Sequence, residues 1–433
     1  MTHTAESVGS RLLVDCTLAA AAGEATGISR VARQLAAACP AEGDRIPWEI
    51  GAVAAYRGIY RHHDVRNEHR RARTGVTARI RTSLRHVDEW MRDHCPHIER
   101  LLAKAVMAAG GIPPVGLPTA SVVAQAPPVG FRRGDVLLLA DATWMIPRWK
   151  PAVMKARDAG AFVVPLVHDL LPLTHPQFFA PLFSAQFERW LVDMIPLADL
   201  LVCNSHATAD ALHEYASNAG LASRLGPVGI VPLGAELPRA SSDPRSQVIA
   251  AFNRSPRPVL MVGTIEPRKN HALVLDAFEQ CWSAGRETPL VVIGRRGWQC
   301  ESTLRRFDRL TAAGRPFTHI AEATDADLDH AYRHARCLLF PSIAEGFGLP
   351  IVEAMAHGLP VIASDIPVHR EVGGRLATYI PFDDATHLAS LLQALESGSI
   401  ALATPEPGSI RLSTWGETVS SIHAQVQRLL HGS

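Results

Sequence analysis

The sequence has no stretch that could cross a bilayer and no strong excess of charge of either sign. No run approaches the roughly 18 uninterrupted apolar residues of a membrane-spanning helix. The apolar start at Leu12–Val14 is interrupted by Asp15 and has no basic segment before it, which argues against a signal peptide. The formal net charge is +1, so overall charge favours neither a nucleic acid nor an acidic polymer as a partner. We expect a cytoplasmic protein that at most lies on the inner face of the cytoplasmic membrane.

The chain also lacks the usual signatures of disulfides, metal sites and common phosphate-binding loops. The cysteines are odd in number and never form a C-x-x-C pair, which predicts reduced thiols. The histidines show no H-E-x-x-H or similar ligand spacing, so we expect no metal site. No G-x-G-x-x-G follows a strand pattern and no G-x-x-x-x-G-K-[ST] occurs, which argues against dinucleotide-binding enzymes and P-loop NTPases. The cysteines are Cys16, Cys39, Cys95, Cys203, Cys281, Cys300 and Cys337.

Apolar material is plentiful and is arranged in short runs. The chain has 433 residues, of which 47% are hydrophobic, so it fits two domains of roughly 200 residues each. Each run has the length of one strand and is apolar on successive residues, which indicates strands that are buried on both faces. Stretches long enough for a helix separate the runs, so the sequence predicts an α/β fold of parallel β-α-β units. The runs lie at residues 12–14, 136–139, 162–167, 200–203, 259–262, 290–293, 337–340 and 361–363.

A polar, turn-rich stretch near the middle of the chain marks a domain boundary. Residues 238–244 read PRASSDP, and residues 254–258 read RSPRP. We therefore place the first domain at residues 1–237 and the second at residues 258–413. Residues 414–433 carry apolar residues at helical spacing and predict an amphipathic terminal helix.

One segment of the first domain, at about residues 57–104, breaks this pattern. It is rich in arginine, and Leu84, Val87, Trp90 and Met91 follow helical spacing. It predicts a helical insertion, for which two interpretations are open. The insertion is either a solvated surface or a basic amphipathic face that contacts anionic lipid or a lipid-linked acceptor.

The most informative segment is FPSIAEGFGLPIVEAMAHGLPVI, residues 340–362. It predicts a strand, a glycine-containing loop, a helix with Pro350 at its start and Gly358 at its end, and a further strand. Glycines beside a helix N-terminus let backbone N–H groups approach an anion, which the helix dipole favours. Glu345 in the loop and Glu353 in the helix can both line the carboxyl edge of the sheet, where α/β proteins bind ligands. Their carboxylates would accept charge-assisted hydrogen bonds from sugar hydroxyls.

This segment resembles the retaining GT-B glycosyltransferases of family GT4, which carry two glutamates in an E-x7-E pattern. The spacing alone is common, but within E-G-F-G-L-P-x-x-E-A-M-A-x-G-x-P-V-I-A-S it is specific. The resemblance implies two Rossmann-like domains that face each other across a cleft, with the nucleotide sugar held by the second. It implies that Glu345 orients the sugar or phosphate side of the donor and that Glu353 binds the ribose hydroxyls. The other donor contacts that we assign in this segment are Gly346, Phe347, Gly348 and Leu349.

A second segment, MVGTIEPRKN, supports the same resemblance. A strand and Gly263 precede two adjacent cations, and a departing diphosphate needs fixed positive charge of this kind. In the family an arginine and a lysine of this loop hold the donor phosphates, and the match by spacing falls on Lys269. Many members carry an arginine directly after the glycine, where this chain has Thr264. We therefore assign the role of the arginine to Arg268 and count Gly263 and Thr264 among the donor contacts.

The first domain matches the family in patches, and the segment around Trp415 resembles the family's terminal helix, which implies that residues 414–433 return to the first domain. The sequence VHDLLP resembles the H-D-L/I-x-P segment of one GT4 subgroup and places His168 near the donor sugar, with a purely structural hydrogen bond as the alternative. Gly27, in TGISR, resembles the glycine of the family's first loop, whose backbone approaches the phosphates. Arg30 in the same segment is a weaker candidate, for which a solvent-facing position is equally open. Asp141 and Trp144 follow another strand and are the candidates for the acceptor side.

Two further patterns are interpreted as helix starts. Asp325-Ala326-Asp327 spells the D-x-D that binds a metal-nucleotide complex in a different glycosyltransferase fold. Here it precedes apolar residues at helical spacing and predicts an acidic helix N-terminus. Asn204–Thr208 predicts a helix cap.

The predicted reaction moves a hexose from a nucleoside-diphosphate sugar to an acceptor hydroxyl, with the retained configuration that the family implies. The loop GTIEPRKN resembles that of bacterial polysaccharide mannosyltransferases, so GDP-mannose is the first choice of donor, and UDP-sugars stay open. The expected acceptor is a surface polysaccharide or a lipid-linked glycan. Because protein cations take the role of a metal, we expect neither a metal nor a cofactor. The alternatives are a GT-B sugar-nucleotide epimerase or synthase, and a non-catalytic nucleotide-sugar-binding module.

Overall fold

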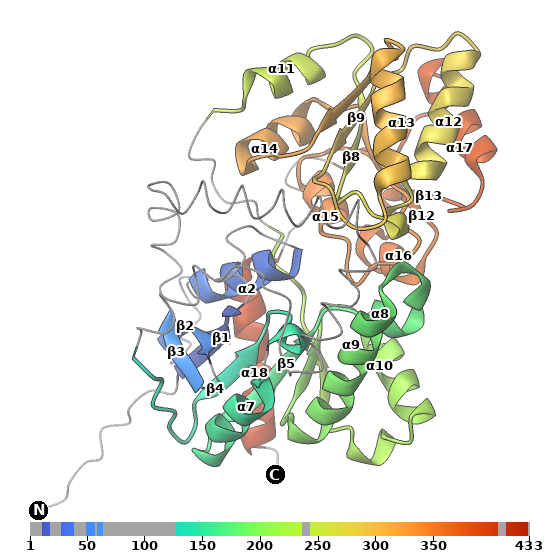
Figure 1. The fold of residues 1–433 in the computed structure, drawn as a ribbon. Coiled ribbons are helices and arrows are strands. Elements are labelled where there is room, and N and C mark those ends of the chain that lie inside the picture. The colour runs from blue at the N-terminus through green and yellow to red at the C-terminus, as the bar shows by residue number, and fades with distance from the viewer. Residues whose placement is uncertain are drawn as a thin grey trace, which may run out of the picture.

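The chain forms two α/β domains, each built on one sheet (Figure 1). The first sheet has the strand order β3-β2-β1-β4-β5-β6-β7, and the second has the order β10-β9-β8-β11-β12-β13. The pairs are parallel except for the edge pair of β2 and β3. The predicted fold class is therefore confirmed. The computed structural model describes residues 11–17, 27–38, 49–56, 59–63, 127–146, 148–235, 243–405 and 413–431.

The first domain alternates strands and helices along the chain. Its strands are β1 (Arg11–Asp15), β2 (Glu49–Tyr56), β3 (Ile59–His63), β4 (Val136–Leu139), β5 (Phe162–Val167), β6 (Leu201–Cys203) and β7 (Val228–Ile230). Its helices are α2 (Gly27–Ala37), α7 (Trp149–Asp158), α8 (Leu171–Thr174), α9 (Pro181–Met194) and α10 (His206–Asn218). Short 3-10 turns lie at η2 (Thr143–Met145), η3 (Pro176–Phe178), η4 (Ile195–Leu197) and η5 (Ala222–Arg224).

The second domain follows the same plan. Its strands are β8 (Val259–Val262), β9 (Leu290–Ile293), β10 (Phe317–Ile320), β11 (Cys337–Phe340), β12 (Val361–Ser364) and β13 (Ala377–Ile380). Its helices are α11 (Ser246–Phe252), α12 (His271–Ser283), α13 (Glu301–Ala312), α14 (Asp325–His334), α15 (Leu349–Ala356), α16 (Pro367–Gly373) and α17 (Ala385–Glu396). The 3-10 turn η6 (Pro267–Lys269) follows β8, and α18 (Trp415–His431) ends the described chain.

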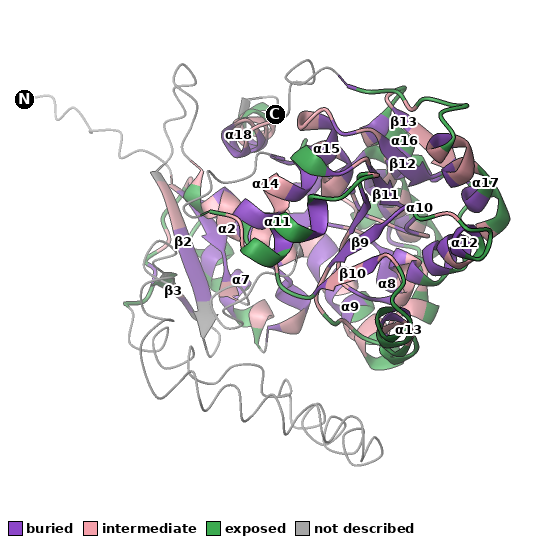
Figure 2. Ribbon diagram, turned by 90° about the horizontal axis from the view of Figure 1, so that it is seen from above, coloured by how far each residue is buried: buried purple, intermediate pink, exposed green. Residues whose placement is uncertain are grey.

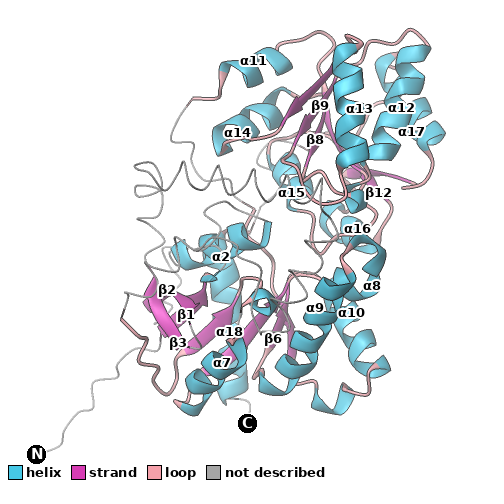
Figure 3. Ribbon diagram, viewed as in Figure 1, coloured by secondary structure: helices cyan, strands magenta, loops and turns pink. Residues whose placement is uncertain are grey.

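Successive residues of the central strands pack on opposite faces of each sheet. In β11, Cys337 and Leu339 belong to the cluster that includes α12, α13 and α17, whereas Leu338 and Phe340 belong to the cluster of α11, α14 and α15. Figure 3 shows helices on both sides of the second sheet, and Figure 2 shows its central strands buried. A strand that is buried on both faces leaves its chemistry to the loop that follows its carboxyl end.

Two helices show where the domains begin and end. α11 lies before residue 258, yet its Val248 packs in the same cluster as α14, so the second domain begins earlier than the sequence predicts. α18 packs Ile422 in the cluster that covers β1 and β4 of the first domain. Thr418 of α18 donates from Oγ1 to the carbonyl oxygen of Pro232 at 2.7 Å. The last helix thus completes the core of the first domain.

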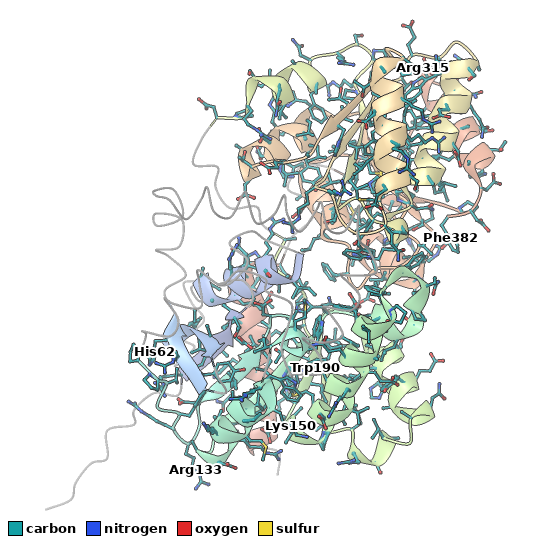
Figure 4. All side chains as sticks on the ribbon, viewed as in Figure 1. His62, Arg133, Lys150, Trp190, Arg315 and Phe382 are labelled. Atoms are coloured by element: carbon teal, nitrogen blue, oxygen red, sulfur yellow. The ribbon has the colours of Figure 1, made fainter. Side chains whose placement is uncertain are left out.

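The arginine-rich segment is described only at its start. Residues 59–63 form the edge strand β3, so the predicted insertion does not begin as a helix at residue 57. Tyr60 of this strand is buried, and His62 is exposed at the edge of the first domain (Figure 4). Residues 64–104 lie outside the described residues. Among the helices that are described, none combines the length and the hydropathy needed to cross a membrane.

Candidate active site

The loop after β11 carries the first predicted glutamate and ends at the start of a helix. β11 ends at Phe340, and α15 begins at Leu349 with Gly348 as its N-cap. Gly348 has a φ of 99°, a left-handed conformation that favours glycine, and it has no side chain to cap the helix. The predicted strand, loop and helix therefore form, and Glu345 lies in the loop between them.

Glu345 is held between the two cations that the sequence predicts from the other loop. Its Oε2 lies 2.8 Å from Nη1 of Arg268, and its Oε1 is paired with Nζ of Lys269. Both cations belong to η6, and Nη2 of Arg268 also lies 2.7 Å from Oε1 of Glu266. The side chains of Lys269 and Glu345 are 10% and 8% exposed. The structure thus brings three predicted site residues together in one largely desolvated ion cluster.

The two cations decide the ionisation of Glu345. Burial by itself raises the pKa of a carboxyl, but Arg268 and Lys269 outweigh it and hold the pKa of Glu345 well below its ordinary value. Burial lowers the pKa of Lys269, and the charge of Glu345 opposes this shift. Burial also raises the pKa of the neighbouring Asp169, against the opposing charge of Arg268. Glu345 is therefore an anion at neutral pH and is unsuited to donate a proton.

Glu353, the second predicted glutamate, has different partners. Its Oε2 accepts a hydrogen bond from the hydroxyl of Tyr332 on α14 at 2.7 Å. Its Oε1 lies 3.0 Å from Nη1 of Arg30. Arg30 belongs to α2 of the first domain, whose first residue is the predicted Gly27. The E-x7-E pair therefore consists of one carboxylate held within the second domain and one that is shared with the first.

His168 follows β5 in the first domain and is buried. Its Nε2 lies 2.7 Å from the carbonyl oxygen of Ala140, and because a carbonyl only accepts, Nε2 carries the proton. Burial lowers the pKa of His168, although the bond to Ala140 and the charge of Asp141 oppose the shift. The neutral ring keeps Nδ1 as an acceptor. This state suits a hydrogen bond from a sugar hydroxyl and does not suit acid catalysis.

Gly346 brings the two domains into contact. A Cβ at this position would lie 2.0 Å from the carbonyl oxygen of His168, so a larger residue does not fit. The carbonyl oxygen of Gly346 accepts hydrogen bonds from Oγ of Ser205 at 2.8 Å and from Oγ1 of Thr208 at 3.2 Å. The sequence predicts that this glycine allows a ligand to approach. In the structure it is the backbone of the first domain that lies against it.

Further contacts surround this loop. The carboxylate of Glu371 on α16 accepts hydrogen bonds from the backbone N–H groups of His206, at 2.8 Å, and Ala207, at 3.1 Å. These two groups begin α10, where a carboxylate is stabilised by the helix dipole. Phe347 and Leu349, both predicted donor contacts, pack against the cluster of α2, α18 and the first sheet. The loop that carries Glu345 is thus fixed from both domains.

The loops after β8 and β9 lie against each other through glycines. The N–H of Gly263 donates to the carbonyl oxygen of Ile293 at 3.0 Å. A Cβ at Gly294 would lie 1.8 Å from the carbonyl oxygen of Gly263, and one at Gly297 would lie 2.7 Å from Cγ2 of Thr264. Gly294 and Gly297 were not predicted from the sequence. The available signal was a glycine directly after the apolar run of β9.

The two acceptor candidates differ in what surrounds them. Asp141 is buried and accepts a hydrogen bond from Oγ of Ser29 at 3.4 Å. Trp144 is also buried, and its ring centroid lies 5.0 Å from that of Phe187 and 5.3 Å from that of Trp190, which Figure 4 labels. Trp144 therefore belongs to the core of the first domain, and of the two candidates Asp141 keeps the polar surroundings that an acceptor site needs.

Asp15 is a buried carboxyl that the sequence analysis did not select. It ends β1 and is 0% exposed, and the hydroxyl of Tyr60 donates to its Oδ2 at 3.2 Å. Burial raises the pKa of Asp15 to about 7, and the charge of Asp141 adds to the shift. Asp15 and Asp141 follow neighbouring strands, so they form a polar patch at the carboxyl edge of the first sheet. The only signal for Asp15 was an acidic residue that ends an apolar run.

The D-x-D pattern is part of a helix start, as the sequence predicts. Thr324 and Asp327 form a capping box at the beginning of α14, and Oδ2 of Asp327 lies 2.8 Å from Nε of Arg245. Ser205 likewise caps α10 by accepting from the N–H of Thr208. Among the described residues, no group of histidine, cysteine, aspartate and glutamate side chains is placed to hold a metal ion.

Likeness to solved structures identifies the class of fold. The crystal structure of Anabaena Alr3699/HepE in complex with UDP covers 98% of this chain and 100% of that chain, with a TM-score of 0.52 at 15% identity. The same protein in complex with UDP and glucose covers 96% of this chain and 95% of that chain, with a TM-score of 0.50 at 16% identity. The protein has the two-domain GT-B fold of glycosyltransferases.

The family of the second domain follows from its sequence. Residues 243–405 match the model of the family described as glycosyl transferases group 1. The serotype-specific mannosyltransferase WbdA of Escherichia coli is 31% identical over 299 residues, which cover 67% of this chain and 37% of WbdA. The O-antigen chain mannosyltransferase B of Escherichia coli is 36% identical over 142 residues, or 32% of this chain and 37% of that protein. The chain thus spans little more than a third of the length of these relatives. The resemblance to GT-B glycosyltransferases is confirmed.

Removing the contacts of α10 with the second domain is expected to loosen the domain arrangement. In the double variant Ser205→Ala/Glu371→Ala, the carbonyl of Gly346 loses one donor, and α10 loses both its Ser205 cap and the acceptor of two N–H groups. This should cost roughly 1–2 kcal/mol of stability. We expect a lower thermal midpoint and a larger radius of gyration in small-angle X-ray scattering.

Asp365→Asn is the matched control, because Asp365 is an exposed carboxylate just before α16. It should leave the midpoint and the scattering unchanged. Identical scattering for the double variant and the wild type would show that these bonds do not hold the domains together.

Proposed function

We propose that the protein is a retaining glycosyltransferase that transfers mannose from a nucleotide sugar to a hydroxyl of a surface polysaccharide or lipid-linked glycan. The observation that carries this proposal is the cluster in which Arg268 and Lys269 meet Glu345, on a loop that lies against His168. The two relatives described above are named as mannosyltransferases, which supports mannose as the transferred sugar. The UDP bound in the HepE structures supports a nucleotide-sugar donor.

The proposed reaction exchanges one bond at the anomeric carbon. The bond from C1 to the diphosphate oxygen breaks, and a bond from C1 to the acceptor oxygen forms on the same face. Negative charge grows on the departing diphosphate, and Lys269 and Arg268 are the fixed cations that stabilise it. The proton of the acceptor hydroxyl passes to the departing phosphate. No catalytic step in this scheme requires a protein proton donor, which agrees with the anionic Glu345 and the neutral His168.

In this proposal the two glutamates contact different parts of the donor. Glu345 orients the sugar and phosphate end, and Glu353 accepts hydrogen bonds from the ribose hydroxyls. His168 accepts a hydrogen bond from a hydroxyl of the transferred sugar through Nδ1. Gly263 and Thr264 lie in the loop that carries the cations, and the acceptor approaches from the side of Asp141. GDP-mannose is the first donor to test, with UDP-sugars beside it.

Replacing Lys269 by methionine keeps an unbranched side chain and removes the charge of Nζ, which lies 4.8 Å from the centroid of the Phe340 ring. We expect kcat to fall by roughly 10²-fold, because one preorganised charge at the leaving group contributes about 3 kcal/mol to the barrier. Steady-state kinetics of nucleotide release with acceptor present measures this. Arg305→Ala, which removes an exposed cation on α13, should leave kcat unchanged. Wild-type kcat in Lys269→Met would remove the lysine from the mechanism.

We propose that the transfer needs no metal ion, because Arg268 and Lys269 supply the positive charge at the leaving group. Protein treated with EDTA and dialysed into metal-free buffer should keep full turnover. Adding Mg²⁺ or Mn²⁺ should change the rate by less than about twofold, well below the roughly 10²-fold effect of losing one charge at the leaving group. Turnover that disappears with EDTA and returns with Mn²⁺ would contradict this proposal.

We further propose that the protein acts at the inner face of the cytoplasmic membrane, with the arginine-rich segment as its contact to anionic lipid. The excess of arginine in this segment supports the proposal, since each basic side chain near an anionic surface contributes about 1 kcal/mol. Co-sedimentation with anionic vesicles should be strong at low salt and weak with neutral vesicles. Equal, negligible sedimentation with both vesicle types would leave only a solvated surface.

A further inference from the structure

The carboxylate of Glu353 belongs to the second domain but meets a cation of the first. Its side chain is 3% exposed, and Nη1 of Arg30 lies 3.0 Å from Oε1. The other oxygen, Oε2, accepts the hydrogen bond from Tyr332 at 2.7 Å. Oε2 is thus hydrogen-bonded within the second domain, whereas Oε1 is buried and ion-paired with the first domain but has no hydrogen bond among the described residues.

The other groups around Glu353 place no positive charge in contact with its carboxylate oxygens. Tyr332 is fully buried, and burial together with the charge of Glu353 raises the pKa of its hydroxyl well above the ordinary value. It therefore stays a neutral donor. His357 lies against the ring of Tyr332, but its Nδ1 binds the backbone carbonyl of Glu353 and its Nε2 lies 3.0 Å from Asp329. Within the described part of the chain, Arg30 is the one cation that contacts this carboxylate.

We propose that Arg30 is a positioning residue of the donor site, which fixes Glu353 for the ribose diol and makes ribose recognition depend on both domains. The inference rests on the proposed function, in which Glu353 binds the ribose. Burying a carboxylate without a nearby cation costs free energy. Without Arg30, the buried position of Glu353 that the ribose diol needs would therefore be unfavourable. With Tyr332 hydrogen-bonded to Oε2 and Arg30 ion-paired with Oε1, the carboxylate is held in place while Oε1 keeps lone pairs that can accept from the diol.

This role differs from the two other roles that an arginine could have here. An arginine that binds the diphosphate directly would contribute equally to nucleotides with and without ribose hydroxyls. An arginine that only stabilises α2 would change the stability of the protein and leave nucleotide affinity unchanged. An arginine that acts through Glu353 contributes only where the diol is present. The ribose hydroxyls of the ligand therefore separate the three roles.

Isothermal titration calorimetry with GDP, UDP and their 2′,3′-dideoxy counterparts tests the proposal. The wild type should bind one of the natural nucleotides and bind its dideoxy form more weakly. Arg30→Ala should weaken binding of the natural nucleotide by at least about tenfold and leave binding of the dideoxy form unchanged. Arg30→Lys should recover part of the loss. Gln34→Ala, on the same helix, is the control and should behave as the wild type.

Each other outcome would exclude one of the proposed roles of Arg30 or Glu353, or the proposed function. An equal loss for the natural and dideoxy nucleotides in Arg30→Ala would overturn the role through Glu353, and so would no loss for either. A wild type that binds the natural and dideoxy forms equally would remove the ribose from the contacts of Glu353. A wild type that binds neither GDP nor UDP would overturn the proposed function itself.

The pairing of the two side chains is tested without nucleotide. Thermal unfolding of Arg30→Ala, Glu353→Gln and the double variant forms a double-mutant cycle. If the ion pair links the domains, the double variant should lose less than the sum of the two single losses. Additive losses would overturn the pairing, whatever the calorimetry shows.

Discussion

The site depends on how the charge of Glu345 is compensated. A carboxylate in a largely desolvated position needs a cation within reach, and this one has two, from a turn that is distant in sequence. Lys269 and Glu345 are 76 residues apart, and they meet because β8 and β11 are neighbours in the parallel sheet. Parallel neighbours end at the same edge, so the loops that follow them converge. The meeting of these two cations with Glu345 is thus a direct consequence of strand order.

The same loop also forms the contact between the domains. Gly346 adjoins Glu345, and its carbonyl oxygen is held by the hydroxyls of Ser205 and Thr208. The carboxylate of Glu371 accepts two further hydrogen bonds from the backbone N–H groups at the start of α10. Trp298 of the second domain donates from Nε1 to the carbonyl oxygen of Phe178 in the first domain at 2.7 Å. A loop held on both sides has little freedom to reorient. The position of Glu345 therefore depends on how the first domain is placed, and in the proposed function this couples the approach of the domains to the binding of the donor.

Local patterns explain why much of this could be predicted from the sequence. Buried parallel strands are apolar on successive residues, and the start of α15 is marked by glycine and proline, so both are visible within a few residues. The cations and the glutamates could be selected because a family motif fixes their spacing, and their roles stay predictions. Gly294 was missed because its reason is a close approach between two loops, and the tyrosine partner of Glu353 because it lies on another helix. The start of the arginine-rich insertion was misjudged because the edge strand β3 carries Arg61, His62 and His63, a polar run without the apolar pattern of the central strands.

The two glutamates show how one motif can serve two different physical purposes. Glu345 receives its compensating charge from its own domain, so this ion cluster is complete within the second domain. Glu353 receives a neutral hydrogen bond from its own domain and its cation from α2 of the first. A nucleotide that first meets the second domain would therefore find the charged cluster formed. The proposed ribose contact, by contrast, is complete only when the first domain brings Arg30 beside Glu353. On this view the order of events follows from which domain supplies each counter-charge.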